Sequence, residues 1–366
     1  MLGGFNDAVH PGSDIGPRVI GSVDHGQIGR AGRLAELLRS QRDWRIDTTS
    51  PELSVVFKSG SRAGAQLAPV SGESSGGYVY VPVFFALAAA IESYRRTYMV
   101  NAGKVDPNSE PRAFAVVVQG VRCRVQRVQE TRYHVRIPSE LLSLSALRMP
   151  DSLSKRLMGH ELDRGGLVVV CGGYGSGKTS TVNAVVRERI EPKGGYALVM
   201  GNPLEYAYSG FHGSNEQPGY IEQVDLVGLD LGAEIKASMR NFPAGAVSIL
   251  AYPELIGCDG VGEMLRAANR GNLVFADMHA LNIEASIINL ISMAAQDGEG
   301  YARELLGNSL KMVIHQTMTA MPGSQSGMSV NYTSIQVSNL MRAAIVDTNM
   351  SLSKAITSVL NTPSGV

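Results

Sequence analysis

Residues 172–179 read GGYGSGKT, which fits the spacing G-x-x-x-x-G-K-[ST] of a phosphate-binding loop. Glycines let successive backbone N–H groups turn toward an anion, and the N-terminus of a following helix adds partial positive charge. In this pattern the lysine, here Lys178, reaches the β- and γ-phosphates, and the hydroxyl of Thr179 binds Mg²⁺. The sequence therefore predicts a site for ATP and Mg²⁺, with Thr179 as the metal ligand. The predicted nucleotide-binding residues are Gly172, Gly173, Tyr174, Gly175, Ser176, Gly177, Lys178, Thr179 and Ser180.

The elements that must hold such a loop flank it directly. Residues 167–171 form a continuous apolar run that is typical of a buried parallel strand, and residues 179–190 have a helical pattern. The glycines thus lie at a strand-to-helix corner, which is where phosphate binding requires them. The alternative is a glycine-rich turn that binds nothing, and this context disfavours it.

A candidate for activating water follows a second apolar run. Residues 247–252 lead through Pro253 to Glu254. A carboxylate at the end of such a strand can order or deprotonate the water that attacks a phosphate. Glu263 is a rival candidate, but no apolar strand precedes it. A solvated residue at a strand end is the remaining interpretation of Glu254.

A third apolar run, residues 273–276, ends in a polar segment that contains Asp277 and His279. An imidazole can both donate and accept hydrogen bonds, so His279 is a candidate to sense the γ-phosphate or a neighbouring subunit. A purely structural histidine is the alternative.

Residues 113–137 carry five arginines against a single acid, Glu130. Three interpretations are open: a strand that faces RNA or DNA, side chains that reach a nucleotide bound next door, or a solvated face. Aromatic residues for base stacking are sparse in this region, which weakens the first. The arginines are Arg122, Arg124, Arg127, Arg132 and Arg136.

The composition describes a globular chain of two domains with balanced charge. The 366 residues include 33 Lys and Arg and 33 Asp and Glu, so no basic excess indicates nucleic acid. Cys123, Cys171 and Cys258 lack C-x-x-C spacing and indicate reduced thiols in a cytosol-like compartment. The apolar run 81–91 is too short to span a bilayer, and the N-terminus lacks a signal pattern. We therefore expect a cytoplasmic protein without a transmembrane segment.

The pattern of elements divides the chain into four parts. We expect an N-terminal arm over 1–45, a small α+β domain over 46–140, a linker over 141–165 and an α/β domain over 166–366. The first two parts should contain helices at 31–44 and 83–99 and strands at 53–57, 77–81, 114–118 and 122–128, and the leucine-rich linker should be helical. Strands at 168–171, 197–200, 247–252, 273–276 and 312–316 alternate with helices. This alternation predicts a mostly parallel sheet with the phosphate loop at the carboxyl end of its first strand.

Further segments, taken in order, resemble the secretion-ATPase superfamily, which includes PilT-like pilus motors and type IV secretion ATPases. The resemblance extends from about residue 110 to residue 358, and the spacing is closest to the DotB/TraJ-like branch. Segment 122–126 resembles R-F-R-V-N, 136–138 resembles R-x-I-P, 202–206 resembles the Asp box E-D-P-[IL]-E-[YF], and 235–240 resembles A-L-R-x-A-L-R. Segment 272–279 resembles the His box G-H-L-V-F-[AG]-T-L-H, and 305–316 resembles L-x-x-S-L-x-x-V-I-x-Q.

In that family the strand-end glutamate precedes the His-box histidine by 25 positions, as Glu254 precedes His279 here, and this spacing favours Glu254 over Glu263. The chain also departs from the family pattern, most of all at positions expected to surround the Mg²⁺ ion. Gly201 and Asn202 replace the acidic pair that opens the Asp box, Pro253 replaces a glycine, Lys236 replaces an arginine, and Asp277 replaces a threonine or serine. These changes bear on the turnover rate and on the Mg²⁺ shell more than on nucleotide binding.

The resemblance implies a RecA-like P-loop domain preceded by a small PAS-like α+β domain, with nucleotide held between them and a hinge within 141–164. Glu254 would act on water, Glu205 and His279 would support it, and arginines would neutralise phosphate charge as the domains close. The implied catalytic residues are Glu254, Lys178, Glu205, His279, Arg122, Arg124, Arg136 and Arg240.

The resemblance also implies an ATPase that assembles as a homo-oligomer, usually a hexamer. It would power a type IV secretion or conjugation machine, of type IVB-like kind, at the cytoplasmic membrane. Inner-membrane components of that machine would be its partners and would hold it peripherally at the membrane, without direct nucleic-acid binding. The alternatives are a type IV pilus ATPase, a nucleotide-binding scaffold with vestigial hydrolysis, and a nucleic-acid translocase.

Overall fold

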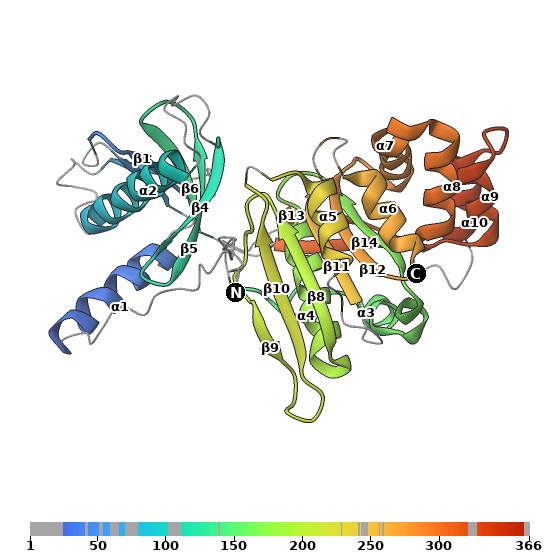
Figure 1. The fold of residues 1–366 in the computed structure, drawn as a ribbon, viewed down its shortest axis with the longest axis horizontal. Coiled ribbons are helices and arrows are strands. Elements are labelled where there is room, and N and C mark those ends of the chain that lie inside the picture. The colour runs from blue at the N-terminus through green and yellow to red at the C-terminus, as the bar shows by residue number, and fades with distance from the viewer. Residues whose placement is uncertain are drawn as a thin grey trace, which may run out of the picture.

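The computed structural model describes residues 25–40, 43–50, 54–58, 66–69, 80–101, 111–137, 140–227, 229–240, 242, 248–255, 257, 260–320 and 328–361. These residues form a small domain around a six-stranded sheet and a large domain around an eight-stranded sheet, which lie side by side in Figure 1. Among them, every helix falls short of the length and apolarity that crossing a bilayer requires.

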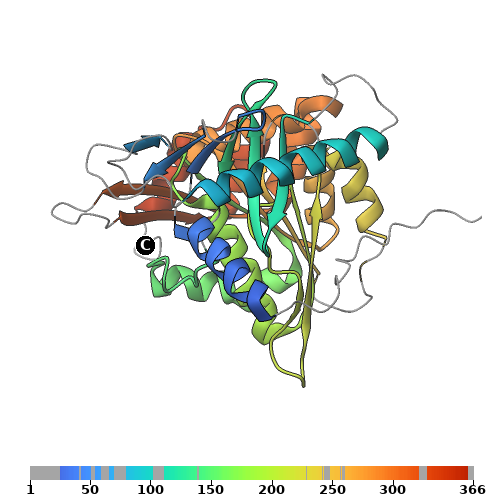
Figure 2. The same ribbon diagram turned by 90° about the vertical axis from the view of Figure 1, so that its left-hand side faces the viewer.

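The small domain is an antiparallel sheet, ordered β3-β2-β1-β6-β5-β4, with helices on one face. Its elements are α1 (His25–Ser40), β1 (Asp43–Asp47), β2 (Val55–Lys58), β3 (Gln66–Pro69), α2 (Val81–Asn101), β4 (Ala113–Val118), β5 (Val121–Arg127) and β6 (Arg132–Arg136). Figure 2 views the helix-covered face, with α2 in front of the strands and α1 below it. Along β5, buried Cys123 and Val125 alternate with partly exposed Arg122 and Arg124. Because successive side chains of a strand point to opposite faces, the arginines leave the sheet on the side away from the helices.

Several small-domain predictions are confirmed and others are revised. Helix α2 and the strand pair β4 and β5 match the expected elements, and β2 lies near the expected strand 53–57. Helix α1 begins at His25, earlier than expected, and carries Ala35 and Leu38 into the core of the small domain. It therefore packs as part of that domain rather than as an arm, although residues 1–24 lie outside the described residues. The strand expected at 77–81 lies mostly outside them too, and its last residue, Val81, begins α2.

The large domain is built on a sheet ordered β14-β13-β7-β12-β11-β8-β10-β9. The neighbours from β13 to β10 run parallel, and β14 and β9 pair antiparallel at the edges. The predicted mostly parallel sheet is thus confirmed. Its strands are β7 (Gly166–Gly172), β8 (Gly195–Gly201), β9 (Gly210–His212), β10 (Gly219–Asp225), β11 (Ser248–Leu255), β12 (Leu273–His279), β13 (Leu310–Ala320) and β14 (Met328–Gln336).

Helices cover both faces of this sheet and form two cores with it. Every residue of β7 is buried, with Val168 and Val170 in the core beneath α4 and Val169 and Cys171 in the opposite core. The first face carries α3 (Asp151–Met158), η4 (His160–Arg164) and α4 (Lys178–Lys193). The second face carries α5 (Leu231–Ser238), α6 (Val261–Asn269), α7 (Ile283–Ala294), η5 (Ala295–Asp297), α8 (Glu299–Ser309), α9 (Asn339–Val346) and α10 (Leu352–Leu360).

The described cysteines agree with the expectation of reduced thiols. Cys123 and Cys171 are free and buried, and Cys258 lies outside the described residues. Burial raises the pKa of Cys123 to about 12 and the pKa of Cys171 to about 11. Both thiols are therefore protonated at neutral pH and act as small apolar core residues.

Residues 141–165 differ from the single helix that the leucine pattern predicted. The chain is irregular up to Pro150, and α3 and η4 follow, separated by Gly159. Proline cannot continue a helix from preceding residues, because it lacks an N–H and its ring clashes with the previous turn. Six apolar residues of this segment are buried in the core beneath α4: Leu144, Leu147, Met149, Leu153, Leu157 and Leu162. The segment is thus fixed to the large domain, which argues against a hinge spread along its length.

A buried arginine anchors this segment, and its loss is expected to be destabilising. The fully buried Arg189 of α4 pairs with Asp163 of η4 and donates to the Leu157 carbonyl oxygen. Substituting Arg189→Ala removes these contacts and leaves a void, so the free energy of unfolding should fall by about 3 kcal/mol. Urea denaturation followed by circular dichroism measures this. Arg132→Ala, at an exposed ion pair with Asp47, is the matched control and should lower the free energy of unfolding by less than about 1 kcal/mol. Equal losses of stability in the two variants would contradict the role of Arg189 as an anchor.

Candidate nucleotide-binding site

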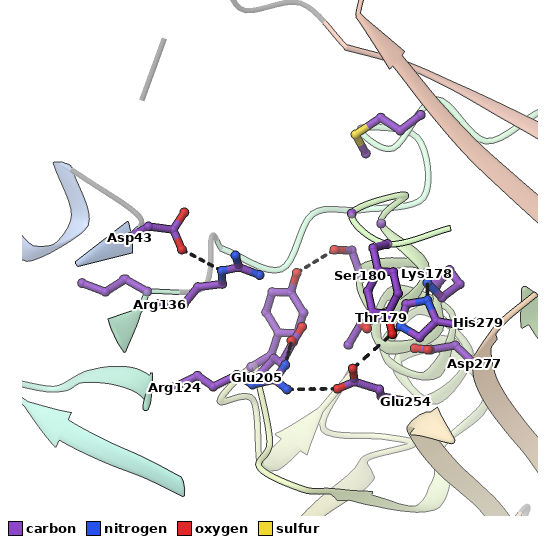
Figure 3. Close-up of a pocket in the computed structure, with 16 residues that line it drawn as sticks. Asp43, Arg124, Arg136, Lys178, Thr179, Ser180, Glu205, Glu254, Asp277 and His279 are labelled. Atoms are coloured by element: carbon purple, nitrogen blue, oxygen red, sulfur yellow. Dashed lines mark hydrogen bonds and ion pairs between the residues drawn. The ribbon is translucent and has the colours of Figure 1, made fainter. Parts of the chain in front are cut away.

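A cavity of about 360 Å³ lies where the carboxyl ends of β7, β11 and β12 meet the N-terminus of α4 and the small domain. Its volume falls within the range of roughly 300–1,000 Å³ that is usual for small-molecule sites. Figure 3 shows side chains from both domains around it, among them Arg124 and Arg136 from the small sheet and Lys178 and Glu254 from the large domain.

The predicted strand–loop–helix corner is confirmed, and the local geometry explains why glycine occupies two of its positions. Strand β7 ends at Gly172 and α4 begins at Lys178. Gly172 has a φ of 156°, and a Cβ there would lie 2.1 Å from the carbonyl oxygen of Gln316, so the close approach of β13 requires glycine. Gly177 has a left-handed φ of 87° just before the helix. The Gln316 side chain also braces the loop, because its Nε2 donates to the Ser176 carbonyl oxygen at 2.7 Å.

Six of the nine predicted loop residues line the cavity: Tyr174, Gly175, Gly177, Lys178, Thr179 and Ser180. Gly172, Gly173 and Ser176 shape the loop instead of lining the cavity. The Ser180 hydroxyl lies 2.6 Å from the Tyr206 hydroxyl, which fixes the first turn of α4 against the Asp-box segment.

Lys178 is folded over its own loop. Its side chain is 5% exposed, its Nζ donates to the Gly173 carbonyl oxygen at 2.9 Å, and His279 Nδ1 lies 3.3 Å from it. Burial lowers the pKa of Lys178, and the negative charges of Asp277 and Glu254 oppose that shift. A phosphate oxygen in this cavity offers the ammonium a charged acceptor, which is stronger than a carbonyl oxygen.

Glu254 reaches the cavity through a local irregularity of β11. The register between β11 and β12 shifts between Tyr252 and Leu255, and Glu254 has a left-handed φ of 70°. Bulges of this kind redirect a side chain, and strained non-glycine backbone is often found at functional sites. Glu254 lines the cavity, whereas the rival Glu263 lies on α6 and pairs with Arg266 at 2.5 Å and with Lys236 at 3.3 Å.

Arg124 joins the two domains at the cavity. Its Nη1 donates to Glu205 Oε1 at 2.5 Å and its Nη2 donates to Glu254 Oε2 at 3.1 Å. Figure 3 shows this guanidinium between the two carboxylates. Charge-assisted bonds from one arginine to two acids make the position of Glu254 depend on the position of the small domain.

His279 completes the polar wall on the β12 side. Its ring stacks on Tyr174 with a centroid distance of 3.7 Å, and its Nε2 lies 3.9 Å from Glu254 Oε1. Burial and the positive charge of Lys178 lower the pKa of His279. The imidazole is therefore neutral at pH 7 and can accept a hydrogen bond at one nitrogen while it donates from the other.

The arginines that the sequence grouped together have separate partners. Arg136 lines the cavity and its Nε donates to Asp43 Oδ1 at 2.8 Å. Arg122 does not line it: its Nη2 donates to Asp225 Oδ2 at 2.5 Å and its Nε donates to the Leu204 carbonyl oxygen at 3.0 Å. The expectation that Arg122 faces the phosphates is therefore not met, because Asp225 holds it beyond the cavity. Arg240, exposed after α5, is likewise outside the lining.

Sequence reasoning missed some residues of the cavity wall. Asp43 and Tyr206 are not among the predicted site residues, and Asp277 was assigned no role, although it stands in the polar segment with His279. The signal for Asp277 was its position two residues before His279, since residues i and i+2 of a strand share a face. Asp43 carried no such signal, because it enters through the pairing of β1 with β6.

The oxygen donors of the cavity fit a magnesium ion that binds together with nucleotide. The described residues hold no group of three or more His, Cys, Asp or Glu side chains arranged to bind a metal alone. The Thr179 side chain lines the cavity, and the Asp277 carboxylate beside it has two oxygens without hydrogen-bond partners among the described residues. Mg²⁺ is usually bound by one or two protein groups, and phosphate oxygens and water molecules complete its coordination.

Comparisons with known proteins agree with this fold. The chain is 27% identical over 210 residues to the type IV pilus retraction ATPase PilT of Pseudomonas aeruginosa, which covers 56% of this chain and 58% of that protein. The chain spans about half the length of the curated relatives it matches.

Two solved structures share the architecture. The pilus retraction motor PilT with bound ADP superposes with a TM-score of 0.65 at 17% identity, over 93% of this chain and 90% of that one. The ATPase DotB of Legionella pneumophila gives 0.63 at 14% identity, over 91% and 86%. These likenesses establish the RecA-like fold of the large domain.

A family model matches more than half of the chain and shows which family it belongs to. Residues 127–355 fit the model of the family described as "Type II/IV secretion system protein", a stretch that contains the phosphate loop, Glu254 and His279. The chain therefore belongs to the type II/IV secretion system protein family, within the secretion-ATPase superfamily.

Proposed function

We propose that the protein hydrolyses ATP in the cavity between its two domains. The observation that carries this proposal is the convergence of Lys178, Glu254 and Arg124 on one cavity at the phosphate loop. Lys178 would contact the phosphates, and the hydroxyl of Thr179 would hold Mg²⁺, which neutralises phosphate charge when bound. The loop amides and the N-terminus of α4 would cradle the phosphates.

The same geometry suggests how water is handled. Glu254 would orient a water molecule toward the terminal phosphate and accept its proton, because its carboxylate reaches the cavity. Glu205 shares Arg124 with Glu254 and would keep the guanidinium in place. Neutral His279, 3.9 Å from Glu254, would hydrogen-bond within the same wall. Arg136 would add positive charge from the small domain.

Arg124 is expected to affect turnover more than binding, because it contacts Glu254 from the other domain. Arg124→Ala should lower kcat roughly 10- to 100-fold while the affinity for ATP changes little. Steady-state kinetics with purified protein measures this. Arg122→Ala is the matched control: Arg122 also bridges the domains, through Asp225, but it does not line the cavity. Equal losses in the two variants would show that bridging the domains, and not contact with Glu254, is what Arg124 provides.

At the level of the cell, we propose a homo-oligomeric motor, of six subunits, that works with the inner-membrane components of a secretion or pilus machine at its cytoplasmic face. The family match and the names of the relatives support this. A type IVB-like secretion or conjugation role and a pilus role both fit. Complementation of a deletion strain with the wild type and with Glu254→Gln, scored for substrate transfer and for pilus retraction, separates the two roles. Small-angle scattering with ADP present tests the oligomer.

A second candidate function is a nucleotide-binding scaffold without productive hydrolysis. One observation favours it: Gly201 and Asn202 stand where the related pattern has two acids, and Asn202 is exposed and outside the cavity lining. Steady-state phosphate release by the purified protein, compared with Lys178→Ala, decides between the two. Release that depends on Lys178 supports the ATPase, and nucleotide binding with background release supports the scaffold.

A further inference from the structure

Asp277 is a buried acid at the cavity that the proposed reaction does not use. It lies on β12, two residues after Phe275 and two before His279, so the three side chains share the face covered by α4. Its side chain is 1% exposed and lines the cavity, and Figure 3 shows it between Thr179 and His279.

The carboxylate of Asp277 lacks the partners that a buried charge normally has. Neither oxygen accepts a hydrogen bond of ordinary geometry from a described residue. Burial raises the pKa of Asp277 to about 7, and the positive charge of Lys178 and the neighbouring Thr179 side chain oppose that rise. Burying an acceptor without a partner is unfavourable, so an orphaned carboxylate in a fold points to a ligand that satisfies it.

Lys178 is the obvious partner for this carboxylate, but it is engaged elsewhere. Its Nζ donates to the Gly173 carbonyl oxygen and contacts His279 Nδ1. A phosphate in the loop would draw the ammonium further toward itself. Asp277 would then face the cavity beside the Thr179 hydroxyl, the residue expected to hold Mg²⁺, and its acceptors suit the water molecules that Mg²⁺ keeps.

We propose that Asp277 is a positioning residue for the magnesium ion that binds with the nucleotide: its carboxylate accepts hydrogen bonds from the ion's water ligands, next to the direct ligand Thr179. The inference rests on the proposed nucleotide site. The acid that faces the magnesium ion's water ligands would then come from β12. The Asp-box segment carries an amide, Asn202, at position 202.

The test is the effect of Mg²⁺ on nucleotide affinity, without turnover. Fluorescence titration with mant-ADP, in Mg²⁺ and in EDTA, gives the gain in affinity that the metal provides. Asp277→Asn keeps the shape and removes the charge, and Asp277→Ser removes the carboxylate. In both variants the increase in mant-ADP affinity that Mg²⁺ provides should be about fivefold or more smaller than in the wild type. Their affinity for mant-ADP in EDTA should stay within about twofold of the wild-type value. Glu263→Gln, a carboxylate-to-amide change on the other face of the sheet, should keep the full gain.

Thermal unfolding in EDTA separates this role from a structural one. Removing an orphaned buried charge should leave the Tm of Asp277→Asn unchanged or raise it. The inference is overturned if a variant shows the same increase in mant-ADP affinity on adding Mg²⁺ as the wild type. It is also overturned if a variant has a lowered Tm in EDTA and binds mant-ADP poorly both with Mg²⁺ and with EDTA. A wild-type protein that binds mant-ADP in neither condition refutes the nucleotide site itself, and the inference with it.

Discussion

Replacing Lys178 with alanine is expected to reduce ATP hydrolysis about 100-fold or more, to background, because it removes the charged donor nearest the phosphate loop. Affinity for ATP with Mg²⁺ should also fall about tenfold or more, which corresponds to about 1.4 kcal/mol. Lys178 is buried beside Glu254 and Asp277, so its ammonium acts in surroundings where solvent screens charge weakly. Phosphate release and isothermal titration calorimetry measure the two effects.

The matched control lies at the other end of the same helix. Lys193 pairs with Asp163 at 2.6 Å, away from the cavity, so Lys193→Ala should keep wild-type affinity and turnover. A Lys178→Ala protein that binds and hydrolyses ATP like the wild type would show that the loop is a turn without a phosphate function.

Replacing Glu254 with glutamine is expected to lower kcat roughly 100- to 1,000-fold while ATP affinity stays within about threefold of wild type. Glutamine keeps the shape of the side chain and can still accept a hydrogen bond from Arg124, but it does not accept a proton from water. The combination of retained binding and lost turnover distinguishes a base from a phosphate ligand. Single-turnover phosphate release and calorimetry on the same preparation test it.

Glu263→Gln is the control for this substitution, because the sequence offered Glu263 as the rival and the structure places it on α6 with Arg266 and Lys236. It should hydrolyse ATP at the wild-type rate. If Glu254→Gln retained the parent rate while Glu263→Gln lost it, the assignment of the base would be reversed.

The parts of the fold that local patterns determine were predicted well. The apolar run ending at Cys171, the glycines after it and the helical pattern that follows allow few other arrangements, and the structure has that strand, loop and helix. The strands that were missed are β1, β3 and β6 of the small sheet and β9, β10 and β14 of the large one. Strand β1 has the sequence DWRID, in which only Trp44 and Ile46 are buried, so five residues gave too weak an alternation to detect.

The site was predicted in part, because its assembly depends on geometry that spacing does not contain. Glu254 enters the cavity through a register shift and a positive φ, whereas an ideal strand would alternate without that shift. Arg122 and Arg124 share a face of β5, and period-two alternation does not distinguish them. The docking of the two domains does: it places Arg124 between Glu205 and Glu254 and places Arg122 against Asp225.

Whether this cavity hydrolyses ATP is decided by steady-state phosphate release from the purified wild-type protein and from Lys178→Ala. We expect continuous, Mg²⁺-dependent phosphate release by the wild type and only background release by the variant. Equal release by both proteins, or no release by the wild type with ATP and Mg²⁺ at saturation, would contradict this expectation.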